Sequence, residues 1–169
     1  SSFVPIYGGI TIRQPMTKRE IRELIPRSNV GGLVVVGSHV NKTTQQLKKL
    51  ISETDIDHVE LTVHAVVSES TRQEEIDRVV KEVEEWIESG KNAVVYTSRE
   101  VTLEKGNKDY QDISQAVSRA LVDVVRSLKV KPRFVLSKGG ITSIVLAKEA
   151  LGARQAYVRG QVLPGVPLW

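Results

Sequence analysis

The sequence of 169 residues has no cysteine, and only 5% of its residues are aromatic. Without cysteine it has neither a disulfide framework nor a thiolate for metal binding or nucleophilic catalysis. With few aromatic side chains it has little to stack on bases, and its basic residues are interleaved with acidic ones. We therefore expect no nucleic-acid partner, although the net charge is +4.

Long hydrophobic runs are missing as well. No apolar stretch approaches the ~18 residues that a membrane helix requires, and no signal-peptide pattern opens the chain, so we expect no membrane partner. The lack of cysteine is typical of cytosolic proteins, and we expect a cytoplasmic location. What is present, 40% hydrophobic residues, is enough for one well-buried globular domain.

Short apolar runs alternate with helical patterns along the chain. Continuous or alternating apolar runs predict strands at 33–36, 58–66, 93–96, 134–136 and 156–158, of which the second is half-exposed. Helical spacing of apolar residues predicts one helix after residue 40 and others at 73–89, 113–128 and about 142–151. This order predicts an α/β fold, a three-layer α/β/α domain with a largely parallel sheet.

The first 32 residues differ from the rest because turn signals surround a single short helical pattern at Lys18–Leu24. We interpret residues 1–32 as an entry segment or domain junction and residues 33–169 as the main domain.

A glycine turn follows the strand that contains Phe134. Gly139 and Gly140 stand between that strand and the next helix, so backbone N–H groups at the helix start converge where the helix dipole favours an anion. Lys138 adds a possible point charge beside them. The spacing is neither the Walker A nor the dinucleotide pattern. A phosphate site is one interpretation, and a plain connection between strand and helix is the other.

Two other expected strands end in polar loops, at 37–39 and 97–99. The carboxyl ends of parallel strands share one edge of the sheet, where α/β proteins bind their ligands. We therefore expect these two loops and the glycine turn to converge on one crevice.

The sequence resembles the four-carbon acid sugar kinase family in its C-terminal, nucleotide-binding domain. The matching segments are spread in order over most of the chain: LVVVGSHVNKTT from Leu33, TSRE from Thr97, RFVLSKGGITS from Arg133 and GQVLPGVPLW from Gly160. The resemblance implies ATP-dependent phosphorylation of a terminal hydroxyl on a four-carbon sugar acid such as threonate or erythronate. It implies ATP with Mg²⁺ as cofactors, and it leaves a homo-oligomer open.

The resemblance also implies roles for single residues. Ser38 and the run Gly139, Gly140, Ile141 and Thr142 would contact the nucleotide. The charge of Lys138 adds a further expected contact, in which it stabilises the transferred phosphoryl group. For Ser38 the alternative is a bond to its own turn, for Lys138 a solvated side chain, and for Thr142 or Ser143 a helix cap. Arg99 would reach a phosphate or a carboxylate, or else form a surface ion pair. His39 is interpreted as a turn residue, and His58 and His64 as members of a solvated strand face.

The sequence departs from the family in two respects. The N-terminal domain that holds the sugar acid and the acidic catalytic residues is absent, and so is a glycine-containing segment beyond Trp169. The catalytic residues therefore stay unassigned, and we expect this chain alone to bind nucleotide weakly and to phosphorylate nothing. The alternatives are a stand-alone nucleotide-binding module without catalysis and a protein that binds phosphosugars.

Overall fold

The computed structural model describes residues 7–9, 13–98 and 110–169. The chain divides into two compact units. Unit 1 comprises the described residues up to Pro26 together with Arg154–Trp169, and unit 2 comprises Arg27–Ala153. The boundary expected between residues 32 and 33 stays a prediction. No helix in the described ranges is both long and apolar enough to cross a membrane.

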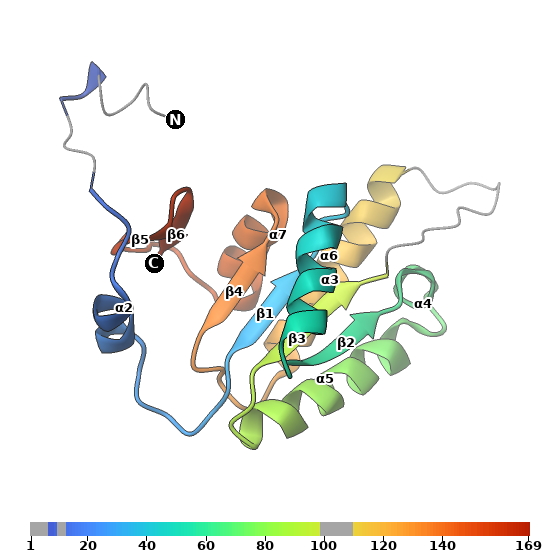
Figure 1. Ribbon diagram of the computed structural model, residues 1–169. Coiled ribbons are helices and arrows are strands. Elements are labelled where there is room, and N and C mark those ends of the chain that lie inside the picture. Colours follow the sequence, from blue (N-terminus) through green and yellow to red (C-terminus); the bar gives the residue numbers. More distant parts are fainter. Residues whose placement is uncertain (1–6, 10–12, 99–109) are drawn as a thin grey trace. The chain divides into compact units, whose positions relative to one another are not determined.

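Unit 2 is built around a four-stranded parallel sheet in the order β2-β3-β1-β4 (Figure 1). Its strands are β1 (Leu33–Val36), β2 (Asp57–Leu61), β3 (Ala93–Thr97) and β4 (Val135–Lys138). Its helices are α3 (Asn41–Glu53), α4 (Val63–Val67), α5 (Arg72–Glu88), α6 (Tyr110–Ser127), α7 (Gly140–Val145) and the π-helical turn η1 (Leu146–Ala150), which continues α7.

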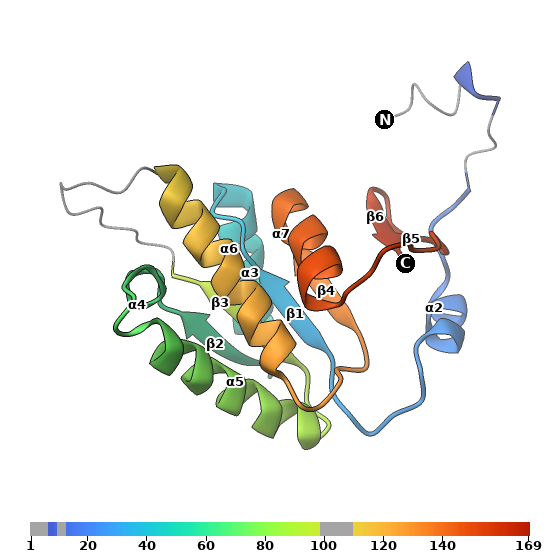
Figure 2. The same cartoon turned by 180° about the vertical axis from the view of Figure 1, so that it is seen from behind.

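The sheet is covered on both faces, so the predicted three-layer α/β/α domain is confirmed. One face, with Leu33, Val35 and Val95, packs in the main core with α5, α6 and η1. The other face, with Val36 and Val94, packs against Leu47 of α3. Figures 1 and 2 show these layers from opposite sides. The continuous apolar runs of β1 and β3 are therefore explained by burial on two faces.

Helix α5 follows its prediction closely. Its buried stripe consists of Ile76, Val79, Val83 and Ile87, and Gly90 follows with a φ of 84°. A left-handed residue just after the last turn is the usual end of a helix, and glycine adopts it without a steric cost.

The strand predicted at 58–66 is wrong beyond Leu61. The alternation holds in β2, where His58 and Glu60 are exposed while Val59 and Leu61 are buried. The chain then leaves the sheet and forms α4, so His64 lies on a helix. The buried pair Val63 and Val66 has the spacing of a helix rather than of a strand.

The strand predicted at 156–158 is also wrong. Tyr157 and Val158 are 76% and 70% exposed, and the described ladder starts two residues later. In unit 1, β5 (Gly160–Leu163) and β6 (Val166–Leu168) form an antiparallel hairpin around Pro164 and Gly165. Three apolar residues become a strand only when a partner strand pairs with them. Here the turn at Pro164 and Gly165 determines which residues pair.

The short helix predicted in unit 1 is confirmed as α2 (Lys18–Leu24). It begins at a capping box: Glu20 accepts hydrogen bonds from the N–H and hydroxyl of Thr17, and the Thr17 hydroxyl accepts from the Glu20 N–H. The hydrogen bonds from the Thr17 hydroxyl and backbone lower the pKa of Glu20.

Candidate functional site

The sheet brings the three predicted loops to one edge. β1, β3 and β4 are parallel, and in register Val36 lies between Tyr96 of β3 and Lys138 of β4. The loops that begin at Gly37, after Thr97 and at Gly139 therefore leave the sheet side by side. The expected convergence of these strand ends is confirmed for the described residues, while Arg99 lies outside them.

The turn into α7 is fixed by hydroxyl groups. The Gly139 carbonyl accepts hydrogen bonds from the N–H of Ser143 at 2.9 Å and from its hydroxyl at 2.8 Å. The Ser137 hydroxyl donates to the Ser143 hydroxyl at 2.7 Å. The Ser143 side chain is thus bonded to a carbonyl within the turn, so the capping alternative does not describe it. Gly139 has a φ of 130°, a value that residues other than glycine rarely adopt.

This geometry orients the first amides of α7. N–H and C=O point in opposite directions across a trans peptide, so a Gly139 carbonyl aimed along the helix leaves the Gly140 N–H aimed away from it. The N–H groups of Gly140, Ile141 and Thr142 precede the first intrahelical bond and have no helical carbonyl to bind. The start of α7 therefore presents a cluster of donors.

Space is available in front of these donors. A Cβ built on Gly140 meets no atom within 4 Å, and the Ile141 side chain is 71% exposed. Lys138 is exposed beside them and forms no ion pair with a described carboxylate. The turn is open rather than occluded, which an anion site requires.

The loop after β1 contacts the first turn of α7. A Cβ at Gly37 would overlap the Thr142 hydroxyl oxygen, and a Cβ at Gly139 would lie 3.4 Å from Ser38 Cβ. The hydroxyl of the buried Thr43 donates to the Ser38 hydroxyl at 3.4 Å. Ser38, Thr142 and the two glycines therefore lie together at this edge.

Side-chain contacts continue toward β3 and β2. The Thr97 hydroxyl, which is buried, lies 3.3 Å from Nε2 of His39. Ser98 donates its N–H to the Leu61 carbonyl at 3.0 Å, and its hydroxyl accepts from the Val63 N–H at 2.9 Å. His39 thus links the carboxyl ends of β1 and β3.

Glu75 anchors the end of β2. Its carboxylate accepts from the Thr62 N–H at 2.7 Å and from the Arg78 guanidinium at 2.7 and 2.8 Å. Burial alone would raise the pKa of Glu75, but the hydrogen bonds from Arg78 and Thr62 outweigh it and lower that pKa. The same pair raises the pKa of Arg78. Because Glu75 also accepts from the Thr62 N–H, the ion pair fixes the turn from β2 into α4.

A metal site made by the protein alone is absent from the described residues, where no three His, Asp or Glu side chains form a cluster. Mg²⁺ that is bound with a nucleotide takes one or two carboxylates beside the phosphate oxygens, so this absence concerns only a metal held by the protein alone. We assign the metal no protein ligand.

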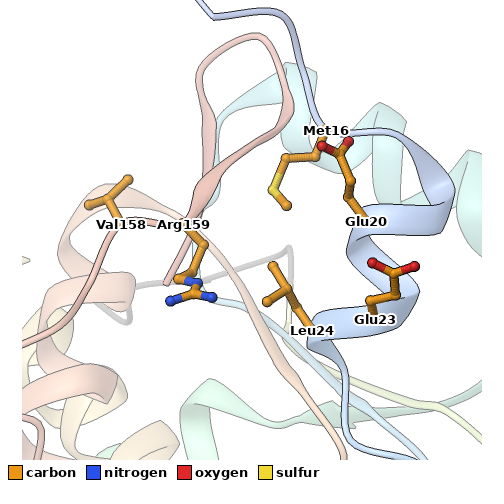
Figure 3. A pocket seen from close by; sticks show the side chains of 6 residues that line it. All are labelled: Met16, Glu20, Glu23, Leu24, Val158 and Arg159. Carbon is orange, nitrogen blue, oxygen red and sulfur yellow. The ribbon is translucent and has the colours of Figure 1, made fainter.

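A separate pocket of about 340 Å³ lies within unit 1 (Figure 3). Met16, Leu24 and Val158 form its apolar part, and Glu20, Glu23 and Arg159 its charged part. None of the predicted site residues belongs to unit 1.

The sequence did not indicate that Thr43 and Glu75 lie near the carboxyl ends of the strands, where the candidate site is. The spacing of Glu75, Arg78 and Glu82 is visible in the sequence as a pattern of helix ion pairs. Its link to Thr62 is not visible, because the two residues meet only when α5 packs on β2.

Comparison with known proteins bears on the family and on the fold. The model of a family described as "Nucleotide-binding C-terminal domain" matches residues 33–169. No curated protein matches the chain. A crystal structure of a domain of unknown function (DUF1537) from Bordetella bronchiseptica, a domain-swapped dimer with bound citrate, is similar with a TM-score of 0.64 at 17% identity.

That similarity covers 82% of this chain but 33% of the Bordetella chain, so the present chain spans about a third of that protein. At such low identity the likeness shows the fold. The family match covers most of this sequence, including all three strand-end loops. The chain therefore belongs to the family of nucleotide-binding C-terminal domains.

Proposed function

We propose that this domain holds ATP for a kinase that phosphorylates a terminal hydroxyl of a four-carbon sugar acid. The observation that carries the proposal is the open cluster of amides at Gly140, Ile141 and Thr142 in a chain of a nucleotide-binding family. The resemblance to the acid sugar kinases supports the reaction and the acceptor. The citrate in the Bordetella protein is a hydroxylated carboxylate, the chemical class of that acceptor.

In this proposal the residues of the chain bind and orient the phosphates. The amides at the start of α7 bind phosphate oxygens, Lys138 supplies a positive charge, and the Ser38 hydroxyl donates a further hydrogen bond. Mg²⁺ bound with ATP would offset the negative charge of the phosphates. Phosphoryl transfer depends mainly on positioning and on electrostatic stabilisation, which are the contributions that this edge is suited to make.

The acceptor hydroxyl is oriented and deprotonated by the family's sugar-acid domain, outside this sequence. Closure of the two domains would exclude water and prevent simple hydrolysis of ATP. We therefore expect no phosphoryl transfer by this chain alone. Threonate or erythronate should become phosphorylated when the sugar-acid domain of a homologue is added.

Titration with a ligand series tests the binding step. We expect affinity to fall from ATP to ADP to AMP, because each phosphate removed takes bonds to the amide cluster with it. Ribose 5-phosphate should bind more weakly than ATP. Equal binding of ribose 5-phosphate and ATP would favour the phosphosugar-binding alternative. No binding of any nucleotide at millimolar concentration would refute the proposal.

A homo-oligomer remains part of the proposal. The dimeric state of the Bordetella protein supports it, and sedimentation equilibrium of the intact chain would test it. A single monomeric species over the whole concentration range would remove it.

A further inference from the structure

We propose that Gly37 is a positioning residue for the phosphate tail of the nucleotide, and that it acts through Thr142. This inference rests on the proposed function, in which Thr142 contacts the phosphates. Gly37 itself contacts no ligand in this account. It leaves room, at the end of β1, for the Thr142 side chain in the first turn of α7.

The space around Gly37 is already filled by other residues. A Cβ there would overlap the Thr142 hydroxyl oxygen and would lie 3.2 Å from the Thr142 methyl carbon and 3.0 Å from Leu121 Cδ1. Leu121 is 2% exposed and belongs to the main core, so it has little freedom to move. The side chain that must give way is therefore Thr142.

Thr142 is confined from a second side. A Cβ at Gly139 would lie 3.0 Å from the same hydroxyl oxygen. Two glycines at neighbouring strand ends thus form a notch, made of Gly37 and Gly139, that receives this hydroxyl. A methyl group at position 37 would displace Thr142, together with its amide in the first turn of α7.

Gly37 suits this test because its φ lies outside the left-handed region. Alanine can adopt its backbone conformation, so any effect of Gly37→Ala arises from crowding. At Gly139, where φ is 130°, backbone strain would accompany any substitution. The position is therefore informative in a way that the second glycine of the notch is not.

The experiment is a double-mutant cycle of Gly37→Ala and Thr142→Ala in the full chain, with ATP, ADP and adenosine as probes. We expect each single variant to weaken ATP binding by roughly tenfold or more, the usual effect of losing a hydrogen bond to a charged group. The double variant should bind ATP within about twofold of Thr142→Ala, since alanine at 142 removes the atoms that Gly37 accommodates. Adenosine binding should not change in any variant.

Gly32→Ala is the matched control. Gly32 precedes the other end of β1, and a Cβ there would overlap the Phe134 ring. This variant crowds the same strand away from the site, so it should lower the melting temperature without changing ATP affinity. It separates a loss of stability from a loss of positioning.

The outcomes are distinguishable. Wild-type ATP affinity in Gly37→Ala, or multiplicative effects of the two substitutions, would overturn the inference while leaving the proposed function intact. Absence of nucleotide binding by the unchanged chain would overturn the proposed function and this inference with it. An equal loss of ATP affinity in Gly32→Ala would show that Gly37 acts through general stability.

Discussion

The two ends of the same sheet use glycine in opposite ways. At the amino ends of the strands, a Cβ at Gly31 would overlap the Lys91 backbone, and one at Gly90 would lie 2.8 Å from the Asn29 carbonyl oxygen. At the carboxyl ends, Gly140 faces open space, and Gly37 and Gly139 face side chains. Glycine allows close backbone packing at the amino ends, whereas at the carboxyl ends Gly140 leaves the start of α7 accessible.

Hydrogen bonds reinforce this difference. Gly31 donates its N–H to the Ile87 carbonyl and accepts from the Arg133 N–H, both at 2.9 Å. The Gly32 N–H binds the Asn92 side chain at 2.8 Å. At the other end, the amides that start α7 have no helical acceptor. The closed end serves stability, and the open end has donors left for a ligand.

The largest effect should come from crowding the closed end. Gly31→Ala forces a methyl group into the Lys91 backbone, which is held just before β3 by the hydrogen bond from the Lys91 N–H to the Trp86 carbonyl. We expect a loss of about 3 kcal/mol in the free energy of unfolding, measured by chemical denaturation. Gly140→Ala is the counterpart at the open end and should change that free energy little. Equal losses would contradict the difference between the ends.

Glu75→Gln tests the ion pair that supports the open end. We expect a loss of about 2 kcal/mol in the free energy of unfolding at neutral pH, because the Arg78 guanidinium loses one of its two charged acceptors and retains Glu82. Glu74→Gln, at an exposed neighbouring position, should lose little.

The pH dependence of that effect has a definite sign. The pKa of Glu75 is lower in the folded chain than in the unfolded chain. Its stabilisation is therefore fully present above the unfolded pKa and disappears as the pH falls through the folded pKa. The difference between wild type and Glu75→Gln should shrink on acidification, and a constant difference would argue against an ionised Glu75.

A smaller effect should follow from Ser143→Ala. It removes the hydroxyl that binds the Gly139 carbonyl and should cost about 1 kcal/mol in the free energy of unfolding. ATP affinity should fall by several-fold because the Gly140 amide loses part of its support. Ser89→Ala removes a comparable bond, to the Trp86 carbonyl at 2.8 Å, at the closed end. Its ATP affinity should match that of the unchanged chain.

Much of the fold follows from local patterns. The sequence patterns predicted β1, β3 and α5 correctly. In these elements the tertiary packing keeps the structure that the spacing of apolar residues favours. The failures at 62–66 and 156–158 lie where tertiary contacts decide. Thr62 and Val63 leave the sheet because Glu75 and Ser98 bind their amides, and no local pattern contains those partners.

The candidate site was predictable to a similar extent. Parallel strands place their ends at one edge, so the convergence of three loops follows from their order. The contact between Gly37 and Thr142 joins residues far apart in the sequence, and nothing near either residue indicates it. The difference between an open and a crowded glycine likewise depends on neighbours that only the folded chain supplies.

The most direct test of the central claim compares ATP affinity in the unchanged chain and in Gly140→Val. A Cβ at 140 meets no atom within 4 Å, so we expect the melting temperature to stay nearly unchanged while the added bulk blocks the phosphates. We predict a loss of affinity of tenfold or more, about 1.4 kcal/mol. A folded Gly140→Val chain that binds ATP as tightly as the unchanged chain would contradict the account.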